Sequence, residues 1–229
     1  MKETSKAVLR RVRQPEFAIR YFVGQGLDIG GGTDPLGLYG ELFPAMTGLK
    51  VWDIVDGDLQ HLTGLADNTF DFVHATFVLQ RMTSPREALS HWLRVLKPGG
   101  HLVVLVPDED MYEQGHWPSR YNHDNRWTFT LFKANSWSPA SVNLLELLPS
   151  LGIQADLRRI ESLDSSFRHR LPRFDQTLSP VGEAAIEFVI RKRPQAEAVA
   201  GGRLNADGPL SARDVFLLTG LRVETPGGG

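Results

Sequence analysis

The sequence predicts a doubly wound α/β fold of the Rossmann-like type, with a mainly parallel sheet and an antiparallel closing strand. Apolar strand-like runs alternate with helical segments, the first strand ends in consecutive glycines, and the connecting loops are short. A chain of 229 residues accommodates one such domain with a full core. We expect this domain over 26–193, after an N-terminal helical lid segment over 1–25 and before an Ala/Gly/Pro-rich tail over 194–229.

Local patterns in the first half define the individual elements. Residues 4–13 and 17–22 are predicted as helical turns, and 26–29, 49–54 and 70–75 as strands, the second of them buried. Ser84-Pro85 followed by Glu87 is typical of a helix N-terminus, and Lys97-Pro98-Gly99-Gly100 ends that helix. The uninterrupted apolar run 102–106 predicts a central parallel strand that is buried on both faces.

The second half is less regular. Residues 107–137 are rich in aromatic and histidine residues and mostly aperiodic, and long ordered loops in compact domains are usually functional. We therefore expect the acceptor site on this loop. Ser138-Pro139 predicts the start of a helix that runs through Leu148, while 153–160 and 184–191 are predicted as the strands that close the sheet. A further short helix is expected over 211–219.

Composition narrows the class of protein. The chain has no cysteine, which excludes disulfides and thiolate chemistry, and its formal charge of -2 offers no bulk attraction to nucleic acid or anionic lipid. It contains no apolar run of about 18 residues, and its first residues lack an apolar signal region. We expect a cytoplasmic protein with no membrane or nucleic-acid partner.

The glycines at the end of the first strand are the first functional signal. In open α/β sheets, ligands bind at the carboxyl ends of the strands near the switch in strand order. Gly30, Gly31 and Gly32 lie at such an end, where glycine allows the backbone to approach a ligand and to present its N–H groups. Asp28, two residues earlier, adds an acceptor suited to an ammonium group.

An ordered series of segments resembles the class I S-adenosylmethionine-dependent methyltransferases, and in particular the methyltransferase type 11 family. These segments are Leu27-Asp28-Ile29-Gly30-Gly31-Gly32, Val51-Trp52-Asp53, Gly57-Asp58-Leu59, Phe70-Asp71-Phe72-Val73 and Arg94-Val95-Leu96-Lys97-Pro98-Gly99-Gly100. The resemblance implies S-adenosylmethionine as cofactor and a methyltransferase activity. It also implies ribose binding by Asp53, adenine contacts at Asp58 and Leu59, and a further cofactor contact at Ala75.

Departures from the family pattern leave alternatives open. Asp34 stands where a third glycine is common, and Asp53 and Asp58 are only five positions apart, which leaves no room for the usual helix. Asp56 is therefore an alternative ribose ligand. Gln80-Arg81 replaces a frequent Glu-His pair, which removes an acidic residue from that position.

Candidate reaction groups lie on the 107–137 loop. A general base is needed only if the acceptor must lose a proton, and His123 is the first candidate, with Asp124 and His116 next. His74, at the end of a strand, is placed to face the methionine part of the cofactor. The candidate substrate-binding residues are Tyr112, Arg120, Tyr121 and Arg126, of which the arginines suit an anionic acceptor. No compact two-histidine helix motif predicts a metal site.

The resulting hypothesis is methyl transfer to an oxygen or nitrogen of a small molecule or glycan. A non-catalytic scaffold that binds the cofactor is the first alternative. A nicotinamide-dependent oxidoreductase shares the fold and an acid at Asp53, but its Gly-x-Gly-x-x-Gly fingerprint would need glycine at Pro35. The absence of a basic domain disfavours a nucleic-acid substrate.

Overall fold

A six-stranded sheet forms the centre of the molecule in the computed structural model, which describes residues 2–203. The strand order is β2-β1-β3-β4-β8-β7, and only β8 runs antiparallel to its two neighbours. The strands are β1 (Gly24–Ile29), β2 (Met46–Trp52), β3 (Phe70–Thr76), β4 (Leu96–Pro107), β7 (Ala155–Leu163) and β8 (Ala185–Lys192). The predicted α/β class, parallel core and antiparallel closing strand are confirmed.

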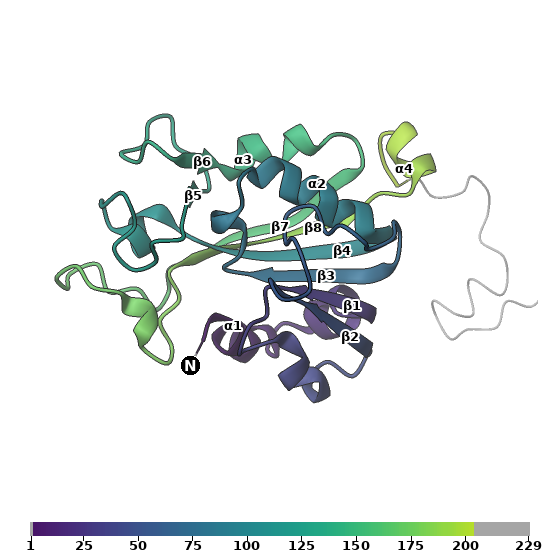
Figure 1. The fold of residues 1–229 in the computed structure, drawn as a ribbon, viewed down its shortest axis with the longest axis horizontal. Helices are drawn as coiled ribbons and strands as arrows, with labels where there is room; N and C mark the ends of the chain where they lie inside the picture. The colour runs from purple at the N-terminus through teal and green to yellow at the C-terminus, as the bar shows by residue number, and fades with distance from the viewer. Residues whose placement is uncertain (1, 204–229) are drawn as a thin grey trace, which may run out of the picture.

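Helical segments cover both faces of this sheet (Figure 1). One side carries α2 (Pro85–Val95) and α3 (Leu144–Leu147), and the other carries α1 (Glu3–Arg11) with short helical turns over Phe17–Tyr21 and Leu36–Leu42. Alternate residues of the central strand serve the two cores: Val104 packs in the cluster with Trp92 of α2, whereas Val103 packs with Phe17 and Phe22. The run 102–106 is buried on both faces because helices cover each of them.

The start of α2 follows its sequence signal closely. Ser84 has extended backbone angles and its Oγ accepts a hydrogen bond from the N–H of Glu87, at 3.3 Å, while Pro85 occupies the first helical turn. On its inner face Trp92 is fully buried, and its indole N–H donates to the carbonyl of Leu59 at 2.9 Å. This bond ties the helix to the segment that follows β2.

Two predictions are wrong. The strand β2 is exposed or half-buried except at Trp52, because it is an edge strand that pairs with β1 alone within 2–203. Residues 138–148 are helical only over Leu144–Leu147, whereas Ser141–Asn143 form β6, which pairs in parallel with β5 (Thr128–Thr130). Ser138 accepts from the N–H of Ala140 at 3.2 Å, a local side-chain bond that competes with helix formation. Ser141 donates its hydroxyl to the distant Glu109 at 2.6 Å.

The remaining connections include short helical turns over Leu79–Arg81, Glu109–Glu113, Pro149–Leu151 and Gln176–Leu178, and α4 (Gln195–Val199) follows β8. Residues 53–69 connect β2 to β3 through turns without a helix, as the spacing of Asp53 and Asp58 predicts. The helix predicted over 211–219 lies outside the described residues. Within 2–203, no helix has the length and apolar character needed to cross a bilayer.

Candidate functional site

The glycine loop after β1 is held in a conformation that only glycine adopts easily. Gly30 and Gly32 have φ angles of 66° and 54°, in the left-handed region. A Cβ on Gly30 would lie 2.6 Å from Cγ2 of Val78, and one on Gly31 would lie 2.8 Å from a carboxylate oxygen of Asp28. At Gly32 the nearest atoms to such a Cβ are 3.9 Å away. The loop therefore packs tightly on its inner side and is open at Gly32.

A cavity of about 350 Å³ lies over this open side. Its wall combines the glycine loop with the end of β3, the residue that follows β2, the start of α1 and one residue of the long loop. The lining includes Glu3, Gly30, Gly31, Gly32, Asp53, Thr76, Phe77, Arg81 and Asn122. Lys2 and Thr4 also line it, so the N-terminal segment forms one side of the cavity; its role as a lid stays a prediction.

Asp53 is fixed at the edge of this cavity. Its Oδ2 accepts a hydrogen bond from the N–H of Gly32 at 2.9 Å, and its Oδ1 accepts from the N–H of Ile54 at 2.7 Å. Asp56 lies in the same turn, but its carboxylate accepts from the N–H of Asp53 at 2.9 Å and lines none of the described cavities around the glycine loop. The geometry thus distinguishes the two acids that the sequence left as alternatives.

A larger cavity, of about 610 Å³, lies next to the first. Its lining consists of Ile54, Gly57, Asp58, Leu59, Arg81, Met82, His123, Asp124 and Arg126. Ile54 is 79 % exposed, so an apolar side chain stands open to a ligand directly after Asp53. Arg81 lines both cavities, which places the two spaces side by side.

Asp58 contributes a carboxylate that already has partners. It accepts from the N–H groups of Gln60 and His61 at 3.1 and 2.9 Å and contacts the His61 ring. Although desolvation opposes the effect, these hydrogen bonds lower the pKa of Asp58 below its ordinary value. Asp58 is therefore ionised at neutral pH and holds the Gly57–Leu59 turn against the larger cavity.

Backbone hydrogen bonds place the long loop over this cavity. The carbonyl of Gln80 accepts from the N–H groups of Arg126 and Trp127, at 2.8 and 3.2 Å, and the indole N–H of Trp127 donates to the carbonyl of Met82 at 2.9 Å. At the other end of the loop, the buried carboxylate of Glu109 accepts from the side chains of Thr128, Lys133, Ser136 and Ser141 at 2.6–3.0 Å. These anchors bring His123 and Asp124 to the cavity wall.

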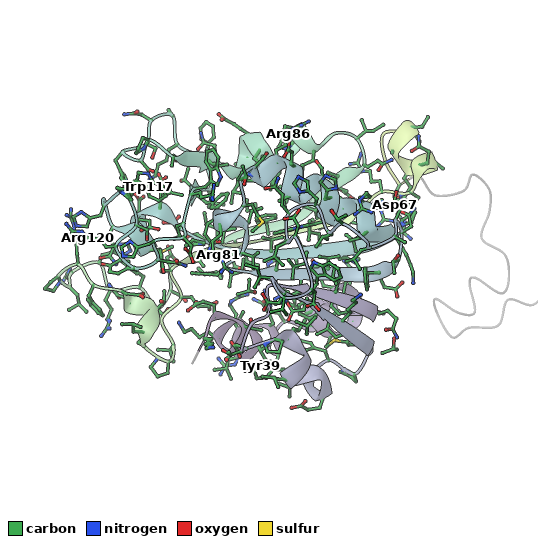
Figure 2. The ribbon with its side chains drawn as sticks, viewed as in Figure 1. Tyr39, Asp67, Arg81, Arg86, Trp117 and Arg120 are labelled. Atoms are coloured by element: carbon green, nitrogen blue, oxygen red, sulfur yellow. The ribbon has the colours of Figure 1, made fainter. Side chains whose placement is uncertain are left out.

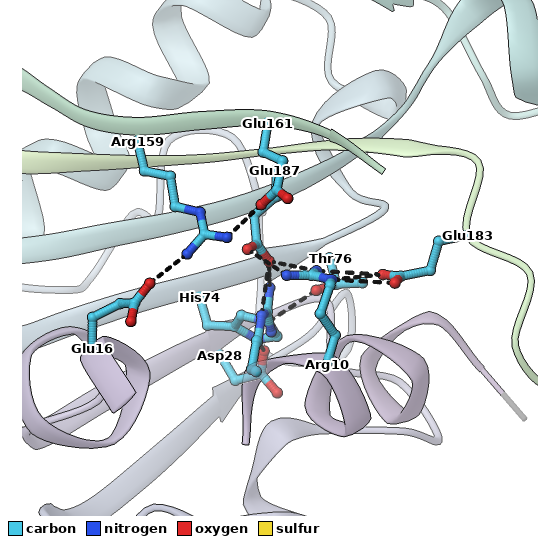
Figure 3. A network of polar contacts seen from close by, with 10 residues as sticks. Arg10, Glu16, Asp28, His74, Thr76, Arg159, Glu161, Glu183 and Glu187 are labelled. Atoms are coloured by element: carbon cyan, nitrogen blue, oxygen red, sulfur yellow. Dashed lines mark hydrogen bonds and ion pairs between the residues drawn. The ribbon is translucent and has the colours of Figure 1, made fainter. Parts of the chain in front are cut away.

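Asp28 lies beneath the glycine loop rather than in the cavity. It is buried, and its Oδ2 accepts from the N–H of Leu36 at 2.7 Å while its Oδ1 lies 2.7 Å from Nδ1 of His74 (Figure 3). Nε2 of His74 lies 3.0 Å from Nη1 of Arg11, which can only donate. His74 therefore accepts at Nε2, carries its proton on Nδ1 and donates to Asp28. It does not face the cofactor cavity, contrary to the prediction.

The network continues from Arg11 to the antiparallel strand. Arg11 and Glu187 are both fully buried, and Nε of Arg11 donates to Glu187 at 2.8 Å. Arg10 adds two bonds to the same carboxylate, at 2.9 and 3.0 Å, and also pairs with Glu183. Although burial opposes it, the positive charge of the two arginines lowers the pKa of Glu187 to about 2. This cluster joins α1, β3 and β8 below the glycine loop.

The candidate catalytic residues separate into two groups. His123 and Asp124 are exposed on the wall of the larger cavity. His116 lines neither cavity; its Nε2 lies 3.4 Å from Nη1 of Arg173, and partial desolvation together with Arg120 and Arg173 lowers its pKa. The geometry favours His123 and Asp124 over His116 as groups that reach an acceptor.

The candidate substrate-binding residues separate in the same way. Arg126 lines the larger cavity, whereas Tyr112 is buried and packs edge-on against Tyr121, with ring centroids 5.7 Å apart. Burial raises the pKa of Tyr112. Arg120 is exposed at the outer edge of the loop, far from Arg81 in the same view (Figure 2). Ala75 is buried in the sheet, one residue before Thr76, which does line the smaller cavity.

Several cavity residues were not selected from the sequence, among them Ile54, Thr76, Arg81 and Asn122. For Arg81 the sequence does contain a signal, because Gln80-Arg81 stands where the resembled family often has Glu-His. Among the described residues, no group of three or more histidine, aspartate or glutamate side chains is arranged to hold a metal ion.

Comparison with known proteins agrees with the fold. A family model described as a methyltransferase domain matches residues 43–104. An S-adenosylmethionine-dependent methyltransferase from Mesorhizobium loti shares the fold, with a TM-score of 0.50 and 14% identity over 83% of this chain and 98% of that structure. The fold of this chain is thus the one seen in that solved methyltransferase, and the expected fold is confirmed.

Individual relatives match a short part of the chain. A ubiquinone/menaquinone biosynthesis C-methyltransferase from Roseobacter denitrificans is 49% identical over 53 residues, which is 23% of this chain and 21% of that protein. A demethylmenaquinone methyltransferase from Renibacterium salmoninarum is 48% identical over 52 residues, which is 23% of this chain and 22% of that protein. The chain thus matches about a fifth of the length of these curated relatives.

Proposed function

We propose that this protein transfers the methyl group of S-adenosylmethionine to a small-molecule or glycan acceptor that occupies the 610 Å³ cavity. The observation that carries the proposal is that the two cavities are adjacent and share Arg81 as a lining residue: one is lined by the glycine loop and Asp53, the other by His123. When bound, S-adenosylmethionine supplies a methyl group on a positively charged sulfur, and transfer is an in-line displacement.

The residues present fit this cofactor. The open side of Gly32 allows a ligand to approach the backbone, and the fixed carboxylate of Asp53 presents acceptors for the two hydroxyl groups of a ribose. The exposed side chain of Ile54 offers an apolar surface for an adenine ring, and the Gly57–Leu59 turn adds polar groups beside it. Asp28 supports this arrangement from below, through the N–H of Leu36 and the ring of His74.

At the acceptor side, we propose His123 as the general base and Asp124 as the alternative. Both are exposed to the larger cavity, so either can take a proton from a hydroxyl or amine of an acceptor bound there. The anchors of the long loop at Gln80 and Glu109 keep these groups near the acceptor and limit the entry of water. An oxygen or nitrogen acceptor follows from this assignment.

Carbon methylation of an aromatic ring is the second candidate, because the relative from Roseobacter denitrificans is named as a ubiquinone/menaquinone biosynthesis C-methyltransferase. A phenolic ring would suit either reaction, since loss of the phenol proton to His123 activates both its oxygen and its ring carbons. Nuclear magnetic resonance of the methylated product separates the two candidates, as an O-methyl and a ring C-methyl differ in chemical shift.

Calorimetric titration with S-adenosylhomocysteine, beside parallel titrations with NADH and NADPH, tests the cofactor assignment. We expect binding of S-adenosylhomocysteine alone. Preference for a nicotinamide nucleotide would support an oxidoreductase instead. Binding of S-adenosylhomocysteine without any turnover of S-adenosylmethionine across hydroxylated, amine and quinone-precursor acceptors would favour the non-catalytic scaffold.

A further inference from the structure

Arg81 is a cation without a partner at the junction of the two cavities. It is half-buried, and its guanidinium makes no hydrogen bond or ion pair with any residue in the described range 2–203. Its Nε is buried and has no hydrogen-bond partner. A partly desolvated guanidinium that lacks a carboxylate is unfavourable, so this position favours a ligand that supplies negative charge.

Arg126 is a second arginine on the larger cavity, and the backbone holds it close to Arg81. Its N–H donates to the carbonyl of Gln80, the residue before Arg81, at 2.8 Å. The side chain of Arg126 is exposed and makes no ion pair with the rest of 2–203. The two arginines therefore come from chain segments that are directly hydrogen-bonded to each other, although 45 positions separate them in the sequence.

The carboxylates on the same cavity do not neutralise this pair. Asp58 is held by the N–H groups of Gln60 and His61 and contacts the His61 ring, and Asp124 forms no ion pair with Arg81 or Arg126. The proposed methyl donor adds a positive charge at sulfur. A neutral acceptor would leave both guanidinium groups without an anionic partner from the described residues, whereas an anionic acceptor supplies one.

We propose that the acceptor carries an oxyanion, a phosphate or a carboxylate, and that Arg81 and Arg126 bind it in the larger cavity. Guanidinium groups form bidentate, charge-assisted hydrogen bonds with both kinds of anion. Arg126 belongs to the wall of the larger cavity that the long loop forms with His123 and Asp124, whereas the wall proposed for adenine comes from the segment after β2. The pair therefore points to the acceptor rather than to the cofactor. This inference rests on the proposed function, and it names the substrate class.

Calorimetry on the whole protein saturated with S-adenosylhomocysteine tests the inference without knowledge of the true acceptor. The probes are phenyl phosphate and benzoate, with phenol as the neutral counterpart. We expect both anions to bind more tightly than phenol. Arg81→Gln and Arg126→Gln should each weaken anion binding by about tenfold or more, the usual loss for a hydrogen bond between charged groups. Comparison of the two anions shows whether phosphate or carboxylate is preferred.

Three controls make the test specific. Arg170→Gln removes the same charge from an exposed residue that lines neither cavity, and it should leave anion binding unchanged. Arg81→Lys keeps the charge without the planar fork and should bind the anions with intermediate affinity. Thermal unfolding and S-adenosylhomocysteine affinity of each variant should match the wild type.

The outcomes separate this inference from the proposed function. Absence of S-adenosylhomocysteine binding in the wild type would contradict the proposed function itself. If the cofactor product binds but neither anion does, or if Arg170→Gln weakens the anions as much as Arg81→Gln, the anionic acceptor is refuted. A loss confined to S-adenosylhomocysteine affinity in Arg81→Gln would assign Arg81 to the cofactor and also overturn the inference.

Discussion

Substitution Glu187→Gln probes the buried cluster beneath the glycine loop. The carboxylate is fully buried and accepts two hydrogen bonds from Arg10, at 2.9 and 3.0 Å, and one from Arg11 at 2.8 Å (Figure 3). An amide keeps the size of the side chain, but it directs N–H groups toward a guanidinium and leaves Arg11 as a buried charge without a carboxylate. Breaking a buried pair in this way costs about 3–5 kcal/mol.

The pKa of Glu187 gives a similar estimate of the stability that its ionised carboxylate contributes. Because the pKa falls from 4.5 to about 2 on folding, the ionised form is favoured in the native state by about 3 kcal/mol, at roughly 1.4 kcal/mol per pKa unit. The sign follows from linkage: this stability is fully present above pH 4.5 and is lost as the pH falls toward about 2. The stability difference between wild type and Glu187→Gln should therefore shrink over that range.

Urea unfolding, followed by tryptophan fluorescence at pH 7, measures the effect. Glu183→Gln is the matched control, because Glu183 is partly exposed and pairs only with Arg10, at 3.2 Å, so its loss should cost about 1 kcal/mol or less. The double variant Arg11→Met with Glu187→Gln should be less destabilised than the sum of its single variants. If Glu187→Gln loses no more stability than Glu183→Gln, the cluster does not support the fold as argued.

Three further predictions concern the site and the pH response. Asp53→Ala should weaken S-adenosylhomocysteine binding by about 1–3 kcal/mol in calorimetry through loss of the ribose acceptor, whereas Asp56→Ala should have little effect; the reverse order would transfer the role to Asp56. His123→Ala should lower turnover by about 100-fold or more, with unchanged S-adenosylhomocysteine affinity, and full activity would exclude it as base. Burial, together with nearby arginines, lowers the pKa of His101 from 6.5 to about 4, so wild-type stability should decrease as the pH falls through that range. His101→Gln should remove up to about 3 kcal/mol of this decrease in urea unfolding, and an unchanged pH profile would contradict it.

Local patterns were sufficient for the core of the fold and for the glycine loop with Asp53 beside it. The Gly30–Gly32 break, the Ser84-Pro85 helix start and the apolar run of β4 each depend on neighbours in sequence, and the structure has all three elements. The position of Asp53 beside Gly32 also follows from sequence, because adjacent parallel strands end at the same edge of a sheet.

Long-range polar contacts explain what local patterns missed. The helix predicted from Ser138 is largely absent, because Ser141 bonds to Glu109, 32 positions away. Helical propensity depends on neighbouring residues and contains no information on so distant a partner. Likewise, the sequence predicts that Asp28 binds an ammonium group, whereas in the structure its carboxylate bonds to the N–H of Leu36 and to the ring of His74. Its role as a direct cofactor ligand stays a prediction.

The cluster under the glycine loop also bears on the order of events during synthesis. Arg11 and Glu187 are 176 positions apart, so the ribosome has made almost the entire domain before Arg11 can meet its carboxylate. Until β8 inserts next to β4, the contact of Arg11 with His74 beneath Asp28 lacks its counter-charge. A nascent chain that stops before 185 therefore holds every residue of the glycine loop but lacks Glu187, the counter-charge of the cluster beneath that loop.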